Sequence, residues 1–298
     1  MHSDDTQAMA LWRRWWLADR RAESTINQYR SELDRLAAGT EQPLLELSRL
    51  EIEDFILQRG EVGSATGRMA FRAVRSFYKF AHSRDMIDPD PTKPIGTPRE
   101  ILNPTPATAT AEHVEQLIAA MDLTDPLAVR DAALITVLFA TGMRRSEALR
   151  NTVDHLDIDA QTMLVPLSKT GVSRTVALSD LVSERLLAWL EIRLSWRPAH
   201  REIWLSRTRD GGNKPLTSNG ARLMFERRTR TADVDLNGLH ALRRGFVVHQ
   251  LSNGVSQVSV ERLGGWRAGS SQVSNYSRSL GAELAVLEYR RANGNGAA

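Results

Sequence analysis

The chain has 298 residues, of which 42% are hydrophobic and 25% charged, with a net charge of +3 and no cysteine. This composition excludes collagen-like, coiled-coil and wholly disordered classes, and the lack of cysteine excludes disulfides, thiolate zinc sites and cysteine nucleophiles. No apolar run approaches the ~18 residues that span a bilayer, and the start is too polar for a signal peptide, so we expect a cytoplasmic protein of about two domains with no membrane contact.

The first 88 residues have a helical pattern throughout and predict a small four-helix domain. Apolar residues recur at helical spacing in four stretches, which cover residues 9–16, 25–38, 49–59 and 64–83. Ser48 and Glu51 have the spacing of a capping box at the start of the third helix.

The fourth of these helices is predicted to be amphipathic. Its apolar face is formed by Met69, Val74, Phe77 and Phe80, and its outward face by Arg68, Arg72, Arg75 and Lys79. Taken alone, the basic face is best interpreted as a solvated surface, with a surface for nucleic acid as the alternative.

A cluster of prolines separates this domain from the rest of the chain. Six of the eleven prolines lie within residues 89–106: Pro89, Pro91, Pro94, Pro98, Pro104 and Pro106. Proline removes a backbone donor and disfavours the helical conformation of the preceding residue. We therefore predict an extended linker over residues 89–106, between a helical domain of residues 1–88 and a second domain of residues 107–298.

The second domain is predicted to be mainly helical with one small β-hairpin or sheet, so the fold class is mainly α of the α+β type. Helical periodicity covers residues 111–120, 126–140, 181–193, 218–230, 239–251 and 258–263. Two short β-rich runs, residues 162–167 and 172–178, are separated by Ser168-Lys169-Thr170-Gly171. Their length and the turn residues between them favour a hairpin.

Several familiar catalytic motifs are absent from the sequence. It has no glycine-rich phosphate loop, dinucleotide fingerprint or His-Glu-x-x-His zinc motif, and its seven histidines lack metal-ligand spacing. The sequence therefore indicates neither a nucleotide-driven enzyme nor a metal site. Arginines outnumber lysines by 35 to 4, which suits bidentate phosphate contacts, although a GC-rich genome would produce the same excess.

Two arginine-containing segments carry polar groups that local structure does not require. In Ala140-Thr-Gly-Met-Arg-Arg-Ser-Glu-Ala-Leu149, Arg144 follows a turn at Gly142 and lies at a helix N-terminus, which favours an anion. An ion pair between Arg144 and Glu147, one turn later, is the alternative. Further along, His240 and Arg243 project from one helix face, which suits phosphate binding with proton transfer or, alternatively, a solvent-facing helix start.

A third segment of interest lies near the C-terminus. Trp266 and Tyr276 flank a stretch rich in glycine and serine. Tyrosines near loops are usually packing residues with an exposed hydroxyl, so this pair alone is a weak signal.

The order of these residues resembles that of the tyrosine recombinase (phage integrase) family. Residues 140–149 resemble the family's first arginine box, and Leu239-His-Ala-Leu-Arg-Arg-Gly-Phe246 resembles its second. Leu263-Gly-Gly-Trp266 ahead of Tyr276 resembles its C-terminal box. A helical N-terminal domain followed by a linker is also the family's layout, so the resemblance extends over essentially the whole chain.

The resemblance implies a mechanism. Tyr276 would attack a scissile DNA phosphate to give a 3′-phosphotyrosine and a free 5′-hydroxyl, without ATP, a metal or another cofactor. Arg144 and Arg243 would bind the non-bridging oxygens. Lys169 would be the general acid for the leaving oxygen, and His240 would assist proton transfer at the tyrosine. Trp266 would occupy the family's last His or Trp position, and Glu147 would support the site.

Three departures from the family's pattern affect these roles. Arg244 stands where the family often has histidine, and the turn at Lys169 lacks the usual Gly-Lys-Gly-x-Lys sequence. Trp266 and Tyr276 are ten positions apart, one more than is common. The role of Lys169 therefore depends on its place in the predicted hairpin.

The resemblance also implies partners. The two domains would clamp double-stranded DNA at a core-type recombination site, with Arg68, Arg72, Arg75 and Lys79 as DNA contacts. A terminal helix predicted over about residues 282–291 would dock on a neighbouring protomer or pack on its own domain. We expect a monomeric or weakly associating protein that forms a tetramer on two DNA sites, with an accessory DNA-bending or directionality factor as a candidate further partner.

The biological role stays open between related activities. We expect no arm-type DNA-binding domain. The Trp-rich start and Trp266 depart from usual Xer sequences, and this difference favours a phage or mobile-element integrase over a Xer-like chromosome-dimer resolvase. A catalytically silent DNA-binding relative is the alternative from another class, although it would not need the whole set of catalytic residues. A type IB topoisomerase is disfavoured by the two-domain layout.

Overall fold

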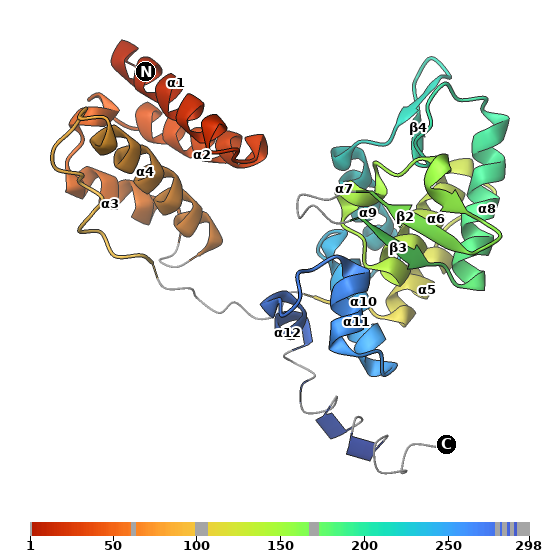
Figure 1. Ribbon diagram of the computed structural model, residues 1–298. Helices are drawn as coiled ribbons and strands as arrows, with labels where there is room; N and C mark the ends of the chain where they lie inside the picture. The colour runs from red at the N-terminus through yellow and green to blue at the C-terminus, as the bar shows by residue number, and fades with distance from the viewer. Residues whose placement is uncertain are drawn as a thin grey trace. The chain divides into compact units, whose positions relative to one another are not determined.

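The structure is a computed structural model that describes residues 2–60, 64–98, 107–166, 173–277, 281, 285–286 and 289–290. The chain divides into two compact units, residues 1–103 and residues 104–298 (Figure 1). Both units are mainly helical, as the sequence predicts, and small antiparallel sheets occur in the second. Within the described part of the chain, no helix combines the length and apolar character needed to cross a membrane.

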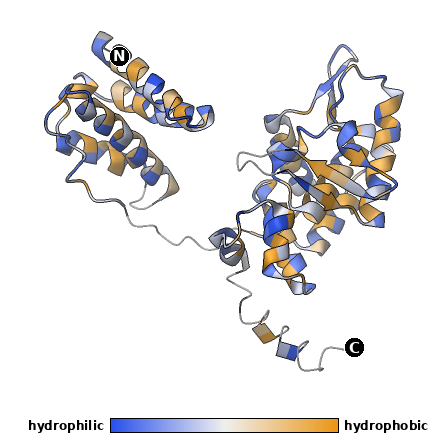
Figure 2. Cartoon of the chain, in the orientation of Figure 1, coloured by the Kyte–Doolittle hydropathy of each residue, from blue (hydrophilic) through white to orange (hydrophobic). Residues whose placement is uncertain are grey.

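In its described residues, the first unit has the four predicted helices and one short 3₁₀ segment. Its elements are α1 (Ser3–Ala18), α2 (Glu23–Ala38), η1 (Leu44–Glu46), α3 (Arg49–Gln58) and α4 (Ala65–Ser83). Aromatic residues of α1 supply much of the core: Trp12 is fully buried, and its indole N–H donates to Ser76 Oγ at 3.1 Å. Hydrophobic and hydrophilic residues are interspersed along these helices (Figure 2).

Local sequence determines where α3 begins and which face of α4 is buried. The capping box is present, because Ser48 Oγ accepts from the Glu51 backbone N–H and the Glu51 carboxylate accepts from the Ser48 N–H at 2.8 Å. Val74, Phe77 and Phe80 are buried as predicted. The prediction for Met69 is wrong: it is half-buried, because it lines an open groove with polar residues of α2.

Residues 89–98, the first part of the proline-rich segment, pack on this first unit. Thr92 is buried, and its hydroxyl donates to Asp90 Oδ1 at 2.7 Å. Ile95 contacts the apolar core. Residues 91–94 form a turn that belongs to the first unit, and residues 99–106 of the predicted linker lie outside the described residues.

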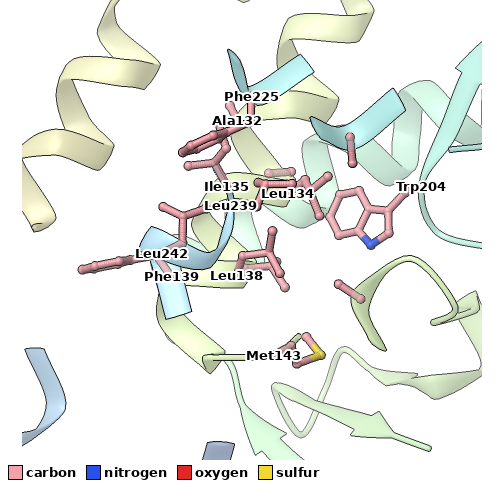
Figure 3. Packing of buried hydrophobic residues seen from close by; sticks show 14 of the residues in the cluster. Ala132, Leu134, Ile135, Leu138, Phe139, Met143, Trp204, Phe225, Leu239 and Leu242 are labelled. Carbon is pink, nitrogen blue, oxygen red and sulfur yellow. The ribbon is translucent and has the colours of Figure 1, made fainter. Parts of the chain in front are cut away.

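The second unit is built around α6. Its helical elements are α5 (Ala111–Ala119), α6 (Pro126–Thr141), α7 (Arg145–Ala148), η2 (Val153–His155), α8 (Asp180–Ser195), α9 (Ser218–Thr231), α10 (His240–Ser252), α11 (Gln257–Gly264) and α12 (Ser271–Ser277). Every residue of α6 from 130 to 139 is buried. Figure 3 shows Trp204 and Phe225 beside the apolar side chains of α6, together with Leu239 and Leu242 from the start of α10.

Two small antiparallel sheets lie among the described residues of the second unit. One has the strand order β1-β2-β3, formed by β1 (Leu156–Asp157), β2 (Thr162–Val165) and β3 (Arg174–Ala177), with Met163 paired to Val176. The predicted hairpin strands are confirmed but shorter, and the turn between them, residues 167–172, lies outside the described residues. The second sheet, β4 (Leu205–Arg207) with β5 (Asn213–Pro215), was not predicted from the sequence.

The last part of the chain packs through a separate apolar cluster. Phe246 and Val247 of α10 meet Val260 of α11 and Val273 of α12. This packing fixes the short helix α12, which carries Tyr276. Most of the terminal helix predicted over residues 282–291 falls outside the described residues.

Candidate active site

Arg144 occupies the N-cap position of α7 and is paired with Glu147. Its backbone N–H donates to Glu147 Oε2 at 2.9 Å, and its Nη1 donates to Oε1 at 2.7 Å. The ion pair expected from the sequence is therefore present. Because the Arg144 side chain is still 35% exposed, part of its guanidinium remains accessible to an anion.

Glu147 is also bonded to a second arginine, Arg174, which sequence reasoning missed. Nη2 of Arg174 donates to Glu147 Oε2 at 2.8 Å. Burial alone would raise the pKa of Glu147, but hydrogen bonds from Arg174 and Arg144 hold the pKa below its usual value. Alternation in β3 was the available signal, because Arg174 shares the inward face of the strand with Val176.

The first arginine segment lies directly against α10. Gly142 has a φ of 61°, and a Cβ at this position would lie 2.3 Å from the Phe246 ring. Only glycine allows this close approach. As a result, Arg243 of α10 reaches the turn and donates from Nη1 to the Gly142 carbonyl at 2.5 Å.

Arg243 is a buried cation beside Arg144. It is 2% exposed, and its Nη2 has no hydrogen-bond partner among the described residues. Burial, with the charge of Arg144, lowers the pKa of Arg243 to about 9, so this group stays protonated at neutral pH. A buried donor of this kind favours an anionic ligand, because an unsatisfied polar group is costly to bury.

Trp266 covers Arg243 because of the turn that ends α11. The backbone N–H of Trp266 donates to the Glu261 carbonyl at 2.8 Å, and the backbone N–H of Gly265 donates to the Arg262 carbonyl at 3.1 Å. With Gly265 in the left-handed conformation, this is the Schellman pattern. This turn places the indole ring over the guanidinium, with 3.7 Å between Arg243 Cζ and the ring centroid. The contact is a cation–π interaction.

Tyr276 and His240 of the same chain form a hydrogen-bonded pair. The distance between His240 Nε2 and Tyr276 Oη is 2.8 Å. The Tyr276 ring also lies 6.1 Å from the Trp266 ring, between centroids. Tyr276 therefore lies on α12 with its hydroxyl directed at the start of α10.

The protonation state of His240 follows from its neighbours. The ring is at the surface, yet the surrounding protein removes part of its water, and this desolvation together with the charges of Arg244, Arg243 and Arg144 lowers the pKa of His240 to about 4. His240 is therefore neutral at neutral pH, and one ring nitrogen is available as a proton acceptor.

The structure brings together most of the residues singled out in the sequence. Those in contact within the second unit are Arg144, Glu147, His240, Arg243, Trp266 and Tyr276. Lys169 lies outside the described residues. The four basic residues of α4 belong to the first unit, where Arg72 and Lys79 are exposed, whereas Arg68 and Arg75 are half-buried. The Arg75 guanidinium lies 5.4 Å from the centroid of the Phe71 ring.

This arrangement combines two chemical capacities. Arg144 and Arg243 provide positive charge and N–H donors for an anion such as phosphate. Next to them, a tyrosine hydroxyl contacts a neutral imidazole, which is the geometry of a nucleophile with its base. Within the described residues, no group of three His, Asp or Glu side chains is placed to hold a metal ion.

Comparisons with known proteins identify the family of this chain. A model of the phage integrase family matches residues 108–283. Tyrosine recombinase XerC of Yersinia pestis is 27% identical over 245 residues, which cover 80% of this chain and 79% of that protein. Tyrosine recombinase XerD of Pseudomonas aeruginosa is 28% identical over 267 residues, which cover 83% of this chain and 84% of that protein.

Solved structures show the same fold. A lambda integrase dimer bound to a COC′ core site aligns with a TM-score of 0.72 at 15% identity, over 91% of this chain and 76% of that chain. XerH site-specific recombinase bound to palindromic difH substrate aligns with a TM-score of 0.69 at 19% identity, over 89% of this chain and 80% of that chain. Because the family model covers more than half of the chain, this protein belongs to the phage integrase family and is a tyrosine recombinase of site-specific recombination.

Proposed function

We propose that this recombinase cuts and rejoins DNA through a 3′-phosphotyrosine formed by Tyr276. The observation that carries the proposal is the 2.8 Å contact between Tyr276 Oη and His240 Nε2, beside the buried Arg243. A neutral imidazole at this distance is a base for the phenol proton. Because both residues belong to one chain, we infer that Tyr276 acts in the site of its own protomer.

The cleavage step transfers one phosphoryl linkage. Tyr276 Oη attacks the phosphorus atom while its proton passes to His240 Nε2, and the bond from phosphorus to the 5′-oxygen breaks. The leaving oxygen takes a proton from a general acid, a role that we assign to Lys169 from the family resemblance. The reverse step, with a 5′-hydroxyl from another strand, restores the phosphodiester and the free tyrosine.

The cations stabilise the negative charge that develops on the phosphoryl oxygens. Arg144 and Arg243 would donate to the non-bridging oxygens, where charge accumulates in the transition state. Trp266 would keep Arg243 in place through the 3.7 Å stacking contact and close the site on that side. The covalent intermediate retains the energy of the phosphodiester bond, so we expect the reaction to need neither ATP nor a divalent metal.

Double-stranded DNA is the proposed partner, and two sites are expected to be joined by a tetramer. The structural relatives include a lambda integrase tetramer bound to a Holliday junction, which has a TM-score of 0.71. That likeness supports an assembly of the same kind for this chain. A helical N-terminal unit with Arg72 and Lys79 exposed on α4 would add contacts to the DNA backbone. A cytoplasmic location would follow from this substrate.

We propose integration of a phage or mobile element as the biological role. Trp266, in place of the histidine of many family members, and the Trp-rich start of the chain favour this role. A Xer-like role in resolving chromosome dimers is the second candidate, favoured by the identity of 27% with Yersinia pestis XerC.

Covalent trapping tests the proposal. The protein would be incubated without metal with nicked duplexes of randomised and source-genome sequence, and the DNA in SDS-resistant adducts would be sequenced. Adducts that vanish in Tyr276→Phe and persist in Tyr289→Phe, a matched control on a tyrosine that is 67% exposed, would support the mechanism. Salt-sensitive binding without any adduct would contradict it and favour a catalytically silent DNA-binding protein.

The trapped sequences also separate the two biological roles. Recovery of a single chromosomal site would favour the Xer-like role. Recovery of two different sites, one in a mobile element and one in its host sequence, would favour integration.

A further inference from the structure

Arg174 is a buried cation at the start of β3 that the roles proposed so far do not use. Its side chain is 8% exposed, and it contacts two segments that are far apart in the sequence. Burying a guanidinium is costly unless its donors are well bonded, so its partners call for a functional explanation.

One set of its donors supports the Arg144 segment. Nη2 donates to Glu147 Oε2 at 2.8 Å, and the same carboxylate accepts from Arg144 at 2.7 Å on its other oxygen. Glu147 is 2% exposed, so it has little access to water and depends on these two cations for its charge balance. Arg174 therefore holds the Glu147 carboxylate in the position from which it bonds to Arg144.

A second donor supports the turn that carries Trp266. Nε of Arg174 donates at 2.6 Å to the carbonyl of Leu263, in the last turn of α11. A cation there satisfies a carbonyl that the helix itself leaves free and opposes the negative end of the helix dipole. A Cβ on Gly265 would lie 2.6 Å from Arg174 Nη1, so the guanidinium also packs tightly against the turn.

We propose that Arg174 is a positioning residue of the recombinase. It joins the Arg144–Glu147 pair to the turn bearing Trp266 and so keeps the two sides of the phosphate site at a fixed position relative to each other. The inference rests on the proposed function. A planar guanidinium can bond to Glu147 and to the Leu263 carbonyl at once, whereas a lysine ammonium is a single point of charge. The geometry of the fork therefore matters as well as the charge.

The test compares Arg174→Met with Arg193→Met in the full chain. Arg193 is a matched control because it is 6% exposed and also donates to backbone carbonyls, those of Glu202 at 2.9 Å and His200 at 2.6 Å, outside the site. Three quantities would be measured on a nicked duplex carrying the trapped site: the single-turnover rate of adduct formation at saturating protein, the Kd for DNA, and thermal unfolding of each variant.

We expect R174M to lower the rate of adduct formation about 10- to 100-fold with little change in Kd, because small misplacements of catalytic groups have effects of this size. R193M is expected to lower only the temperature of unfolding. In a Glu147→Gln background, R174M is expected to have an effect at least about threefold smaller, because the two residues act through one network.

The outcomes separate this inference from the proposed function. No adduct with the wild-type protein would overturn both. Three results would overturn the inference alone. They are adduct formation by R174M at the wild-type rate, equal losses of adduct-formation rate in R174M and R193M below their unfolding temperatures, and fully additive effects of R174M and E147Q on that rate. If R174M does not fold, Arg174→Lys replaces it: a reduced rate at unchanged Kd supports the inference, and a wild-type rate overturns it.

Discussion

Desolvation and the charges of three nearby arginines keep His240 in the neutral form, which can accept a proton. With its pKa lowered to about 4, it is neutral over the whole range in which an ordinary histidine titrates. Protonation would remove its acceptor nitrogen and add a fourth positive charge beside three arginines. Cleavage is therefore expected to decline only when the pH falls through the lowered pKa, with no inflection near the usual value of about 6.5.

Removing the charge of Arg244 should move this decline to higher pH. Arg244 lowers the pKa of His240 by charge repulsion, so Arg244→Gln raises that pKa, and the rate is lost at a higher pH than in the wild type. Arg244→Lys keeps the charge and serves as the control. The measurement is the pH dependence of single-turnover adduct formation, and identical acid limbs in R244Q and R244K would contradict the prediction.

Gly264 determines where Trp266 can lie. A Cβ on Gly264 would lie 1.8 Å from the Trp266 ring, so Gly264→Ala forces the indole away from Arg243. Loss of a partly buried cation–π interaction corresponds to about 1–2 kcal/mol, and we expect adduct formation to slow about tenfold. Gly281→Ala, where the Cβ position is open, is the control. A wild-type rate in G264A would show that the stacking is dispensable.

At the scale of elements, α6 and α9 are joined by a buried charge cluster. Asp131 of α6 is fully buried and accepts from Arg130 Nε at 2.9 Å and from Arg228 Nε of α9 at 2.9 Å. Asp131→Asn would leave these guanidiniums buried without a counter-charge. We expect a loss of about 3–5 kcal/mol in the free energy of unfolding, measured by urea denaturation.

An exposed ion pair on the same helix provides the control for this prediction. Arg222 and Glu226 of α9 are 2.6 Å apart but both are more than two-fifths exposed. Exposed pairs contribute about 0–1 kcal/mol, so Glu226→Gln should change stability little. Equal effects of D131N and E226Q would contradict the structural role of the buried cluster.

The elements differ in how well the sequence predicts them. Long helices such as α4 and α6 are predictable because their periodicity and their caps, for example Ser64 of α4 or Asp125 of α6, are encoded locally. The strands β1, β4 and β5 have two or three residues each and are too short for alternation to be recognised. The helix α12 is stabilised by packing of Val273 on other helices, which no local pattern reports.

The site shows the same division between local and non-local information. Residue type and order are enough to single out Arg144, His240, Arg243 and Tyr276. The stacking of Trp266 on Arg243 is not predictable, because it depends on a turn and a helix that meet only in the folded chain. Alternation places Arg174 on the inward face of β3 but does not reveal its partner, because Glu147 lies 27 positions earlier in the chain.

At the scale of the whole molecule, DNA binding should depend steeply on salt. Arg72 and Lys79 are exposed on one face of α4. The logarithm of the DNA-binding constant falls linearly with the logarithm of the salt concentration, and removing a cation that binds one phosphate should make this slope less negative by about 0.9. Arg72→Gln and Lys79→Gln are therefore expected to weaken binding and flatten the slope. Arg49→Gln, which removes a cation already paired with Glu53 at 2.7 Å, is the control. Unchanged slopes in R72Q and K79Q would mean that this face is merely solvated.

Assembly is the property that the single chain does not display. Cutting and rejoining two duplexes needs four nucleophiles, one for each strand, and Tyr276 in contact with its own His240 supplies one per protomer. We therefore expect a monomer or weak dimer in gel filtration with light scattering, and a tetramer once duplexes carrying the trapped site are added. Tyr276→Phe should assemble in the same way, because it removes the nucleophile and not the contacts with DNA. A stable tetramer without DNA, or a monomer on paired sites, would contradict this expectation.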